Sequence, residues 1–261
     1  MARTLGAGWR MQTEVIGALL IRELATRFGR RNIGFLWIMA EPLLFAVLVG
    51  VMWRFMRGSS EHGISVFAFV VSGYIPLVLF RHAVSRCVGL FSANASLMVH
   101  RQIHIADFIF ARFAIEWIGH MMAYLAIAVL LMAAGVFPVP ADMGLLLAGW
   151  VCYALFTLGV CFILAPLSEM SPVLERLMPV ATYLMVPFSG TFHMLDWVAP
   201  DARAVLVWSP PVHAMEMMRA GLFGHQVSAT FDPAYPLAVS AICLLVGLGL
   251  CRHVRRAMVV E

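Results

Sequence analysis

The chain contains no lysine, so all 18 of its basic residues are arginine. A Walker A loop needs a lysine to contact the nucleotide phosphates, and this chain therefore cannot be a P-loop ATPase by itself. Charged residues are also scarce: they make up 12% of the 261 residues, whereas a soluble domain carries about a quarter. Together with 62% hydrophobic residues and a mean hydropathy of +0.89, this composition excludes a soluble globular protein and indicates a membrane protein.

Signatures of enzymes and metal sites are missing as well. The five cysteines show no CxxC spacing and lie mostly inside apolar segments, which is typical of small core residues. His100 and His104 have the i, i+4 spacing of a zinc helix, but Arg101 stands where a metalloprotease has its glutamate. The sequence has no GxSxG motif and no pair of carboxylates at catalytic spacing in a loop outside the membrane. We therefore expect no catalytic residue, metal ion or cofactor on this chain.

Six apolar segments approach the length of about 20 residues that a membrane-spanning helix needs. They are residues 33–53, 64–80, 113–134, 143–165, 177–192 and 234–251. The second and fifth are short and contain proline, which is tolerated where neighbouring protein or water satisfies the freed backbone groups. The sequence thus predicts an all-α membrane protein with six transmembrane helices, forming one domain over residues 1–261.

The arginines are distributed unevenly between the predicted loops. Fourteen lie on the side of the amino terminus, whereas the other side has only four: Arg54, Arg57, Arg203 and Arg219. Because cytoplasmic loops collect positive charge, both termini are predicted to be cytoplasmic in a multi-pass protein of the bacterial inner membrane. The same rule accounts for the net charge of +4 and the isoelectric point near 9.0, so we expect no nucleic-acid partner.

Two predicted connections are too long to be simple turns, and a further segment precedes the first span. Residues 1–32 are predicted to be cytoplasmic, with an interfacial helix over 9–28 because its apolar residues recur at roughly helical spacing. A cytoplasmic connection covers residues 81–112. An external connection, 193–233, alternates apolar and polar residues around a central proline pair, which predicts a pair of short helices folded onto the outer mouth. Spans one to five then occupy 33–192, and the last span with its tail occupies 234–261.

Ionisable residues inside the predicted spans are expensive unless they pair or face water. Glu41 lies in the first span directly before Pro42, so we expect it to pair with a neighbouring helix or to line a hydrated path. The third span has a polar residue at every fourth position, which places them on one face: Arg112, Glu116, His120 and Tyr124. This face is either an Arg112–Glu116 ion pair that anchors the cytoplasmic end or a lining of the translocation path.

Aromatic residues number 30, and several lie near the predicted membrane boundaries. Most are expected to be interface anchors. A subset that faces a central path could stack on the apolar faces of sugar rings. The candidates for glycan stacking are Trp37, Tyr74 and Trp208.

Four stretches resemble the type-2 ABC exporter permeases, and in particular their capsular polysaccharide branch, the KpsM-like permeases. They are RELATRFGRRNIGFLWIMAEPL (22–43), FSANASLMVHRQIHIADFIFAR (91–112), SPVLERLMPV (171–180) and WSPPVHAMEMMRAGLFG (208–224). In that family they correspond to the approach to the first span, the cytoplasmic loop, the start of the fifth span and the external loop. The resemblance therefore covers almost the whole chain.

The resemblance implies a homodimer of six-span subunits, each docked on a separate ABC ATPase that holds ATP and magnesium. Such an exporter moves lipid-linked capsular polysaccharide across the inner membrane and hands it to periplasmic or outer-membrane partners. By position, residues 203–224 would form external gate helices and 97–105 a cytoplasmic coupling helix. The coupling residues would be Leu97, His100, Arg101, Ile103 and His104.

Other functions remain open from the sequence. A permease of the same fold could export O-antigen, teichoic acid or a small molecule, and the identity of the glycan is not encoded in any motif found here. An integral membrane enzyme that works without a partner is a further alternative, and it would turn over substrate in detergent alone. A structural scaffold would show neither transport nor stimulated ATP hydrolysis.

Overall fold

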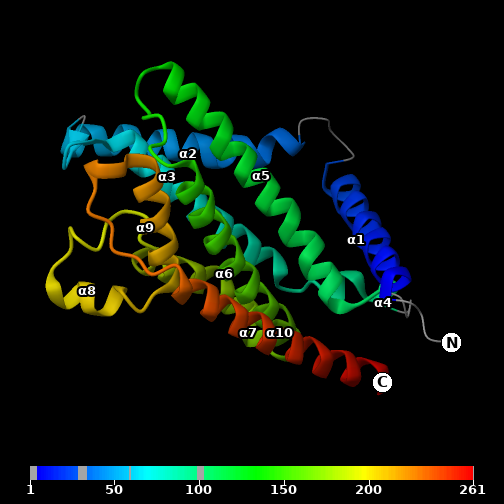
Figure 1. Cartoon of the computed structure of the whole chain (residues 1–261). Coiled ribbons are helices and arrows are strands. Elements are labelled where there is room, and N and C mark those ends of the chain that lie inside the picture. The colour runs from blue at the N-terminus through cyan, green and yellow to red at the C-terminus, as the bar shows by residue number, and fades with distance from the viewer. Residues whose placement is uncertain (1–4, 29–33, 59, 99–102, 261) are drawn as a thin grey trace.

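The computed structural model describes residues 5–28, 34–58, 60–98 and 103–260. Within these ranges the chain is almost entirely helical (Figure 1). The α-helices are α1 (Leu5–Phe28), α2 (Gly34–Arg57), α3 (Val66–Cys87), α4 (Ala95–Met98), α5 (Ile105–Ala133), α6 (Met143–Met170), α7 (Pro172–Phe188), α8 (Pro200–Leu206), α9 (Pro210–Phe223) and α10 (Ala234–Val260). Two short 3-10 turns, Ser92–Asn94 and Gly224–Gln226, precede α4 and follow α9.

A two-stranded antiparallel hairpin joins α2 to α3. Its strands are β1 (Ser60–Glu61) and β2 (Ile64–Ser65), with Glu61 paired to Ile64. The two residues of the turn, His62 and Gly63, both have positive φ, at 51° and 81°. Tight hairpins require this backbone conformation because its twist matches that of the strands. The hairpin therefore reverses the chain sharply between two long helices.

Within the part of the chain that the structure describes, four helices are long and apolar enough to cross a membrane: Val66–Cys87, Ile105–Ala133, Met143–Met170 and the Ala234–Arg255 part of α10. All four were expected, although their ends differ from the predicted ones. In α2 the described apolar part, Leu43–Met56, is shorter than a full span. The remaining predicted span corresponds to α7, which has 17 residues and ends at Phe188.

Two helix ends differ from the predictions for identifiable reasons. α5 begins at Ile105, ahead of the predicted residue 113, because His104 and Asp107 form a capping box: each side chain meets the other residue's backbone N–H. α3 continues to Cys87, although its apolar run ends at Phe80, and Pro76 lies inside it without ending it. The predicted cytoplasmic connection from residue 81 therefore begins inside a helix.

The connections between the long helices gather at two ends of the molecule (Figure 1). α1, α4 and the C-terminal end of α10 lie at one end, whereas the β-hairpin and α8 lie at the opposite end. The two short helices expected in the long connection before the last span are formed, as α8 and α9. This arrangement places the described ends of the chain on one side of the bundle.

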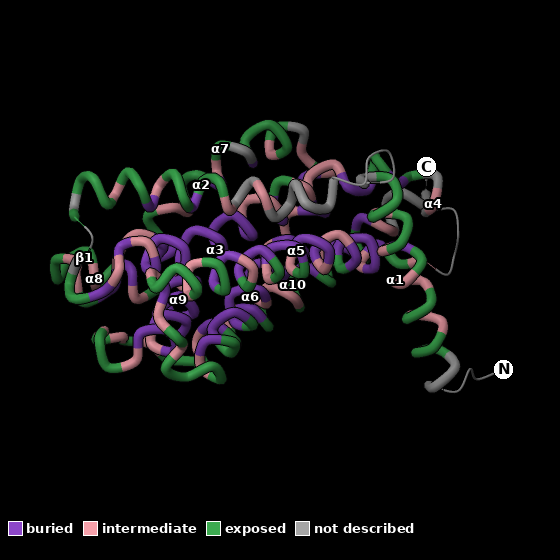
Figure 2. Tube along the Cα trace, turned by 90° about the horizontal axis from the view of Figure 1, so that it is seen from above, coloured by how far each residue is buried: buried purple, intermediate pink, exposed green. Residues whose placement is uncertain are grey.

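α3 and α6 form the centre of the bundle. Every residue from Ala68 to Phe80 of α3 is buried, and the purple tube in Figure 2 shows this continuous burial. α6 packs against α10 on one side and α9 on the other. Close packing depends on glycine: a Cβ on Gly149 would lie 2.8 Å from the Ala214 carbonyl oxygen, and one on Gly247 would lie 2.6 Å from the Phe162 carbonyl carbon.

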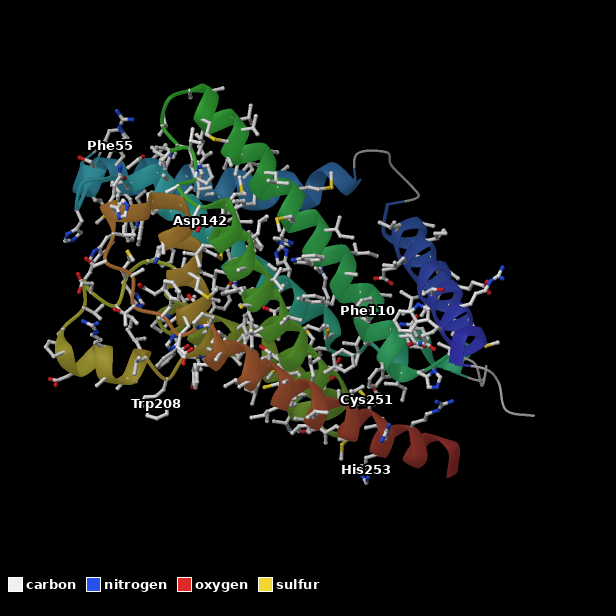
Figure 3. All side chains as sticks on the ribbon, in the orientation of Figure 1. Phe55, Phe110, Asp142, Trp208, Cys251 and His253 are labelled. Carbon is white, nitrogen blue, oxygen red and sulfur yellow. The ribbon has the colours of Figure 1, made fainter. Side chains whose placement is uncertain are left out.

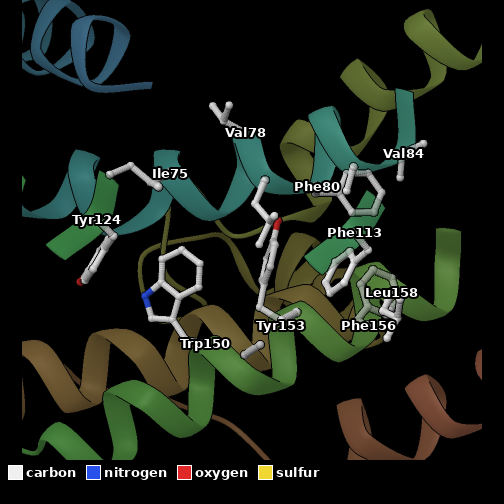
Figure 4. Close-up of a cluster of buried hydrophobic side chains, with 14 of the residues drawn as sticks. Ile75, Val78, Phe80, Val84, Phe113, Tyr124, Trp150, Tyr153, Phe156 and Leu158 are labelled. Carbon is white, nitrogen blue, oxygen red and sulfur yellow. The ribbon is translucent and has the colours of Figure 1, made fainter. Parts of the chain in front are cut away.

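Aromatic side chains fill the space between α3, α5 and α6 (Figure 4). Trp150 and Tyr153 of α6 are fully buried. Tyr124 of α5 packs edge-on against Trp150, with ring centroids 5.2 Å apart. Phe80 of α3 stacks on Phe156 at 6.3 Å. The polar residues of α5 thus lie beside a tightly packed apolar core.

Large apolar side chains cover the outer faces of the bundle. α2, α5, α7 and α10 all expose them, among them Phe55 (88%), Leu130 (62%), Leu184 (68%) and Leu245 (70%). In water such faces would aggregate, whereas lipid tails solvate them. The surface therefore agrees with the composition in indicating a membrane protein.

Candidate functional site

The polar face of α5 points into the protein, where α1 and α3 meet it. Glu116 and His120 are completely buried, and Tyr124 is 3% exposed. The Arg86 Nε of α3 lies 2.9 Å from Glu116 Oε1, and His120 Nδ1 lies 2.8 Å from the backbone oxygen of Glu116. The i, i+4 spacing predicted that these residues share one face of the helix, and the structure adds that this face is buried.

The ion pairs along this face join different helices. Arg112 was one candidate partner for Glu116, but it pairs instead with Glu23 of α1, with Nε 3.1 Å from Oε1. Arg112 also donates to the carbonyl oxygen of Arg86 at 2.8 Å. An Arg112–Glu116 pair was one of two interpretations of this face. The structure has the pairs Arg112–Glu23 and Arg86–Glu116 instead, because α1 and α3 bring an opposite charge to each side chain. These contacts tie α1, α3 and α5 together.

His82, Glu116 and His120 form a cluster whose ligand-type atoms all lie within 4.8 Å of one another. The rings of His82 and His120 meet edge to face at 5.3 Å. Two histidines and a carboxylate have the composition of a zinc site. The Arg86 guanidinium, however, already contacts one oxygen of Glu116, and a divalent cation would add positive charge beside it. The geometry favours charge pairing between α3 and α5 over metal binding.

A second buried polar cluster surrounds α9, and no sequence pattern predicted it. Arg219 is fully buried and donates to the carbonyl oxygens of Gly190 at 2.6 Å and His193 at 2.7 Å, and to that of Thr191. Its guanidinium also lies 3.7 Å from the ring centre of Phe69. These carbonyls follow α7, so Arg219 supplies donors and positive charge where that helix ends.

Two acceptors on α9 complete this cluster. Glu216 accepts hydrogen bonds from the backbone N–H groups of Leu195 at 3.0 Å and Thr230 at 3.1 Å. Burial raises the pKa of Glu216 and lowers the pKa of Arg219 to about 9. His213 lies 2.8 Å from the Val207 carbonyl oxygen and accepts from the Asp232 N–H at 3.0 Å. α9 therefore anchors the loops that precede α8 and α10.

Only an indirect signal in the sequence pointed to this cluster. Glu216 and Arg219 interrupt a mainly apolar segment that follows the proline pair at positions 210 and 211. Their partners are backbone groups of loops, whose conformation depends on tertiary packing. From the sequence alone, Arg219 is therefore only a charge in the external connection.

The predicted coupling segment lies where α4 leads towards α5. Leu97 and Ile103 are half-buried and pack against the core of the bundle. His104 is exposed, and its backbone N–H donates to Asp107 Oδ2 at 2.8 Å. His100 and Arg101 lie outside the described residues. The two apolar members of the segment thus connect it mechanically to the bundle.

The aromatic candidates are placed differently from one another. Trp208 is 73% exposed and projects away from the helices after α8 (Figure 3). Tyr74 is 9% exposed and faces Phe45 of α2 with ring centroids 6.4 Å apart. Trp37 and Glu41 belong to α2, but their side chains lie outside the described part of the structure. Of the three aromatics, Trp208 is the one the structure describes as accessible.

Comparison with known proteins relates this chain to membrane proteins of polysaccharide transport systems. The family model described as "ABC-2 type transporter" matches residues 14–223. The chain is 37% identical to the capsule polysaccharide export inner-membrane protein CtrC of Neisseria meningitidis serogroup B, over 92% of this chain and 91% of that protein. It is 34% identical to the protein of the same description, BexB, of Haemophilus influenzae, over 90% and 88%. The polysialic acid transport protein KpsM of Escherichia coli is 25% identical over 99% of both chains.

Proposed function

Because the chain belongs to the ABC-2 type transporter family, we propose that it is the membrane permease subunit of an ATP-driven exporter of capsular polysaccharide. The observation that carries the proposal is the identity of 34–37% to inner-membrane proteins named for capsule polysaccharide export, over nine-tenths of the chain. Such a subunit transports substrate without catalysing a reaction itself. The absence of lysine agrees with this, because a P-loop must then come from another chain.

The complete exporter contains two copies of this chain, each bound to an ABC ATPase that holds ATP and magnesium. Each copy is proposed to have six spans, with α2 and α7 as the first and fifth, so that both termini lie on the same side of the membrane. We assign this side to the cytoplasm of a bacterium. The 14 to 4 distribution of arginines supports this orientation, and so does the position of α1 and the end of α10 at one end of the bundle (Figure 1). The substrate is a lipid-linked polysaccharide, which periplasmic or outer-membrane partners receive.

The cytoplasmic segment that the ATPase contacts is 97–105. It meets the first turn of α5 at His104, and α5 is tied to α1 by Arg112–Glu23 and to α3 by Glu116–Arg86. A displacement of the segment by ATP binding would therefore move α5 with its two neighbours rather than bend a loop. Force transmission of this kind needs packed elements with two discrete arrangements.

The outer side of the path is formed by the α8–α9 region, where Trp208 offers an accessible aromatic face. Trp37 and Glu41 are proposed to contribute at the first span, Glu41 by pairing or by lining a hydrated entrance. Tyr74, which is buried against Phe45, would contact glycan only after α2 and α3 separate. Arg112, Glu116, His120 and Tyr124 are proposed as structural pairing residues of the moving bundle.

Deletion of the gene in a capsulated bacterium tests the proposal. Capsular polysaccharide is expected to disappear from the cell surface and to accumulate in the cytoplasm, and a plasmid copy restores it. Loss of O-antigen or teichoic acid with an intact capsule would assign the permease to another glycan. Substrate turnover by the purified chain without an ATPase would instead identify an enzyme.

A further inference from the structure

Arg81 is a charged residue inside a membrane-spanning helix. α3 covers Val66–Cys87, and Arg81 comes directly after the apolar run that ends at Phe80. With a rise of about 1.5 Å per residue, it lies about 22 Å from the hairpin end of α3, roughly two-thirds of the way along the helix. An arginine at this depth is costly in lipid unless it pairs with another group or faces a water-filled path.

An aromatic ring holds the Arg81 side chain. Its guanidinium lies 3.9 Å from the ring centre of Tyr183 on α7, and a cation over an aromatic face is attracted by the electrons of the ring. The Arg81 Nε is buried and has no hydrogen-bond partner among the described residues. Stacking uses the flat face of the guanidinium, whereas its N–H donors point outwards along its edge. Tyr183 thus fixes the direction of these donors.

Tyr183 lies on an accessible face of α7. It is 59% exposed, and so are its neighbours on this face, Val180 (63%) and Leu184 (68%). Figure 2 shows α7 along the same edge of the bundle as α2. A hydroxyl group in hydrocarbon loses its hydrogen bonds to water, and this loss is unfavourable. We therefore expect this side of α7 to face a polar path in the assembled exporter.

We propose that Arg81 and Tyr183 form a site that contacts an anionic group of the exported substrate, a carboxylate or a phosphate. Arginine binds both groups through paired hydrogen bonds from the edge of its guanidinium, and the tyrosine hydroxyl can donate another. The identity of the ligand as an exported substrate rests on the proposed function. The preference of the site for anions does not, and it can be measured without export.

Glu41 is the competing partner of Arg81. It belongs to α2, which packs against α3, and its side chain lies outside the described residues. The proposal requires that Arg81 itself meets the anion, and it does not depend on an excess of positive charge around the site. Replacing Glu41 together with Arg81 therefore distinguishes a direct contact with the ligand from an ion pair between the two helices.

Binding of fluorescent ligands to the purified full-length chain in phosphatidylcholine nanodiscs tests the site. The ligands are a decyl glucuronide, a decyl phosphate and an uncharged decyl glucoside. Both anionic ligands are expected to bind more tightly than the glucoside. Arg81→Gln should weaken the binding of the anionic ligands about tenfold, because it removes a hydrogen bond between charged groups. It should change glucoside binding by less than about twofold, which also shows that the variant is folded.

Matched variants distinguish charge from geometry. Arg81→Lys keeps the charge but loses the planar donors, so the anionic ligands should bind about threefold more weakly. Tyr183→Leu removes the stacked ring and should weaken their binding about fivefold, whereas Tyr183→Phe keeps the ring and should have a smaller effect. The control Arg54→Gln removes the same charge from an exposed position near the end of α2 and should change binding by less than about twofold.

The tighter of the two anionic ligands identifies the source of the anion. Tighter binding of the glucuronide indicates carboxylates of the glycan, and tighter binding of the phosphate indicates the lipid-linked end. Three results would overturn the proposal: equal affinity for all three ligands, equal loss in Arg81→Gln and Arg54→Gln, and restored anion binding in Arg81→Gln with Glu41→Gln. The last would show that Arg81 only pairs with Glu41. The assay contains no ATPase, so failure of the site leaves the proposed function to be judged by the capsule of the deletion strain.

Discussion

Glu116 is the residue on which the polar contacts between α3 and α5 converge. It is completely buried, whereas the side chain of its partner Arg86 is 39% exposed. Removing one member of a buried ion pair costs about 3–5 kcal/mol when the other charge stays buried. The cost is therefore unequal for the two partners, since Arg86 can reach water and Glu116 cannot.

Arg86→Gln is accordingly expected to destabilise the protein by about 3–5 kcal/mol, and Glu116→Gln by less, because the neutral amide leaves no buried charge. Thermal unfolding of the purified variants measures both. The exposed Glu175→Gln is the control and should change the free energy of unfolding by no more than about 0.5 kcal/mol. Equal or greater loss in Glu116→Gln would show that the pair does not depend on burial of the carboxylate.

The sequence predicted which side chains share a face of α5 better than it predicted the residues with which they pair. The four-residue spacing placed Glu116, His120 and Tyr124 on one face, and they are buried on it. The partner of Arg112 could not be predicted, because Glu23 is 89 residues away along the chain and reaches it only through the packing of α1 on α5. The role of Arg219 was equally hidden, since its partners are loop carbonyls.

Helix contacts depend on small residues at a few crossing points. Gly149 lets α6 approach α9 so closely that an added Cβ would lie 2.6 Å from Met218 Cγ. Gly249, in α10, has nothing within 4 Å of the same added atom. The two helical glycines therefore form a matched pair, in which Gly149 is buried and crowded and Gly249 is exposed with open space around it.

Gly149→Ala is expected to lower stability by about 1–3 kcal/mol, because the new methyl group forces α6 and α9 apart. Gly249→Ala should be neutral or raise stability by up to about 1 kcal/mol, since alanine favours helix. Thermal unfolding in detergent distinguishes the two. Similar effects at both positions would contradict the close approach of α6 and α9.

The proposed coupling role of the segment 97–105 leads to a further prediction. Replacing Arg101 and Ile103 together by aspartate should release the ATPase on co-purification or uncouple ATP hydrolysis from export. Because Ile103 packs against the core, Arg101→Asp alone separates weaker docking from damage to the fold. Ala93→Asp with Ala95→Asp, at two exposed neighbouring positions, is the control. Parental binding and export in the double variant would exclude this segment as the coupling element.

The long helices could be predicted from apolar runs because a membrane demands such runs. Their ends could not, because the ends are set by local contacts. The start of α5 depends on the His104–Asp107 capping box. The end of α7 lies beside carbonyls that a distant arginine satisfies, and no hydropathy pattern encodes that contact.

For the whole molecule, orientation in the membrane decides which side faces the cytoplasm. The proposed roles of the segment 97–105 and of the α8–α9 region depend on it. With the five native cysteines replaced, Asp201→Cys on α8 should react with a membrane-impermeant thiol reagent in intact, outer-membrane-permeabilised cells. Ala93→Cys should react only after the inner membrane is opened. Both positions are exposed, so accessibility within the protein does not limit either reaction. The opposite pattern would reverse the topology.

The function of this chain as a permease depends on a separate ATPase. Reconstitution into proteoliposomes, with and without the ATPase subunit, tests it directly by measuring transfer of labelled lipid-linked capsular polysaccharide across the bilayer. Transfer is expected only when the chain, the ATPase and hydrolysable ATP with magnesium are all present. Transfer by the chain alone, or no transfer by the complete system while ATP is hydrolysed, would contradict it.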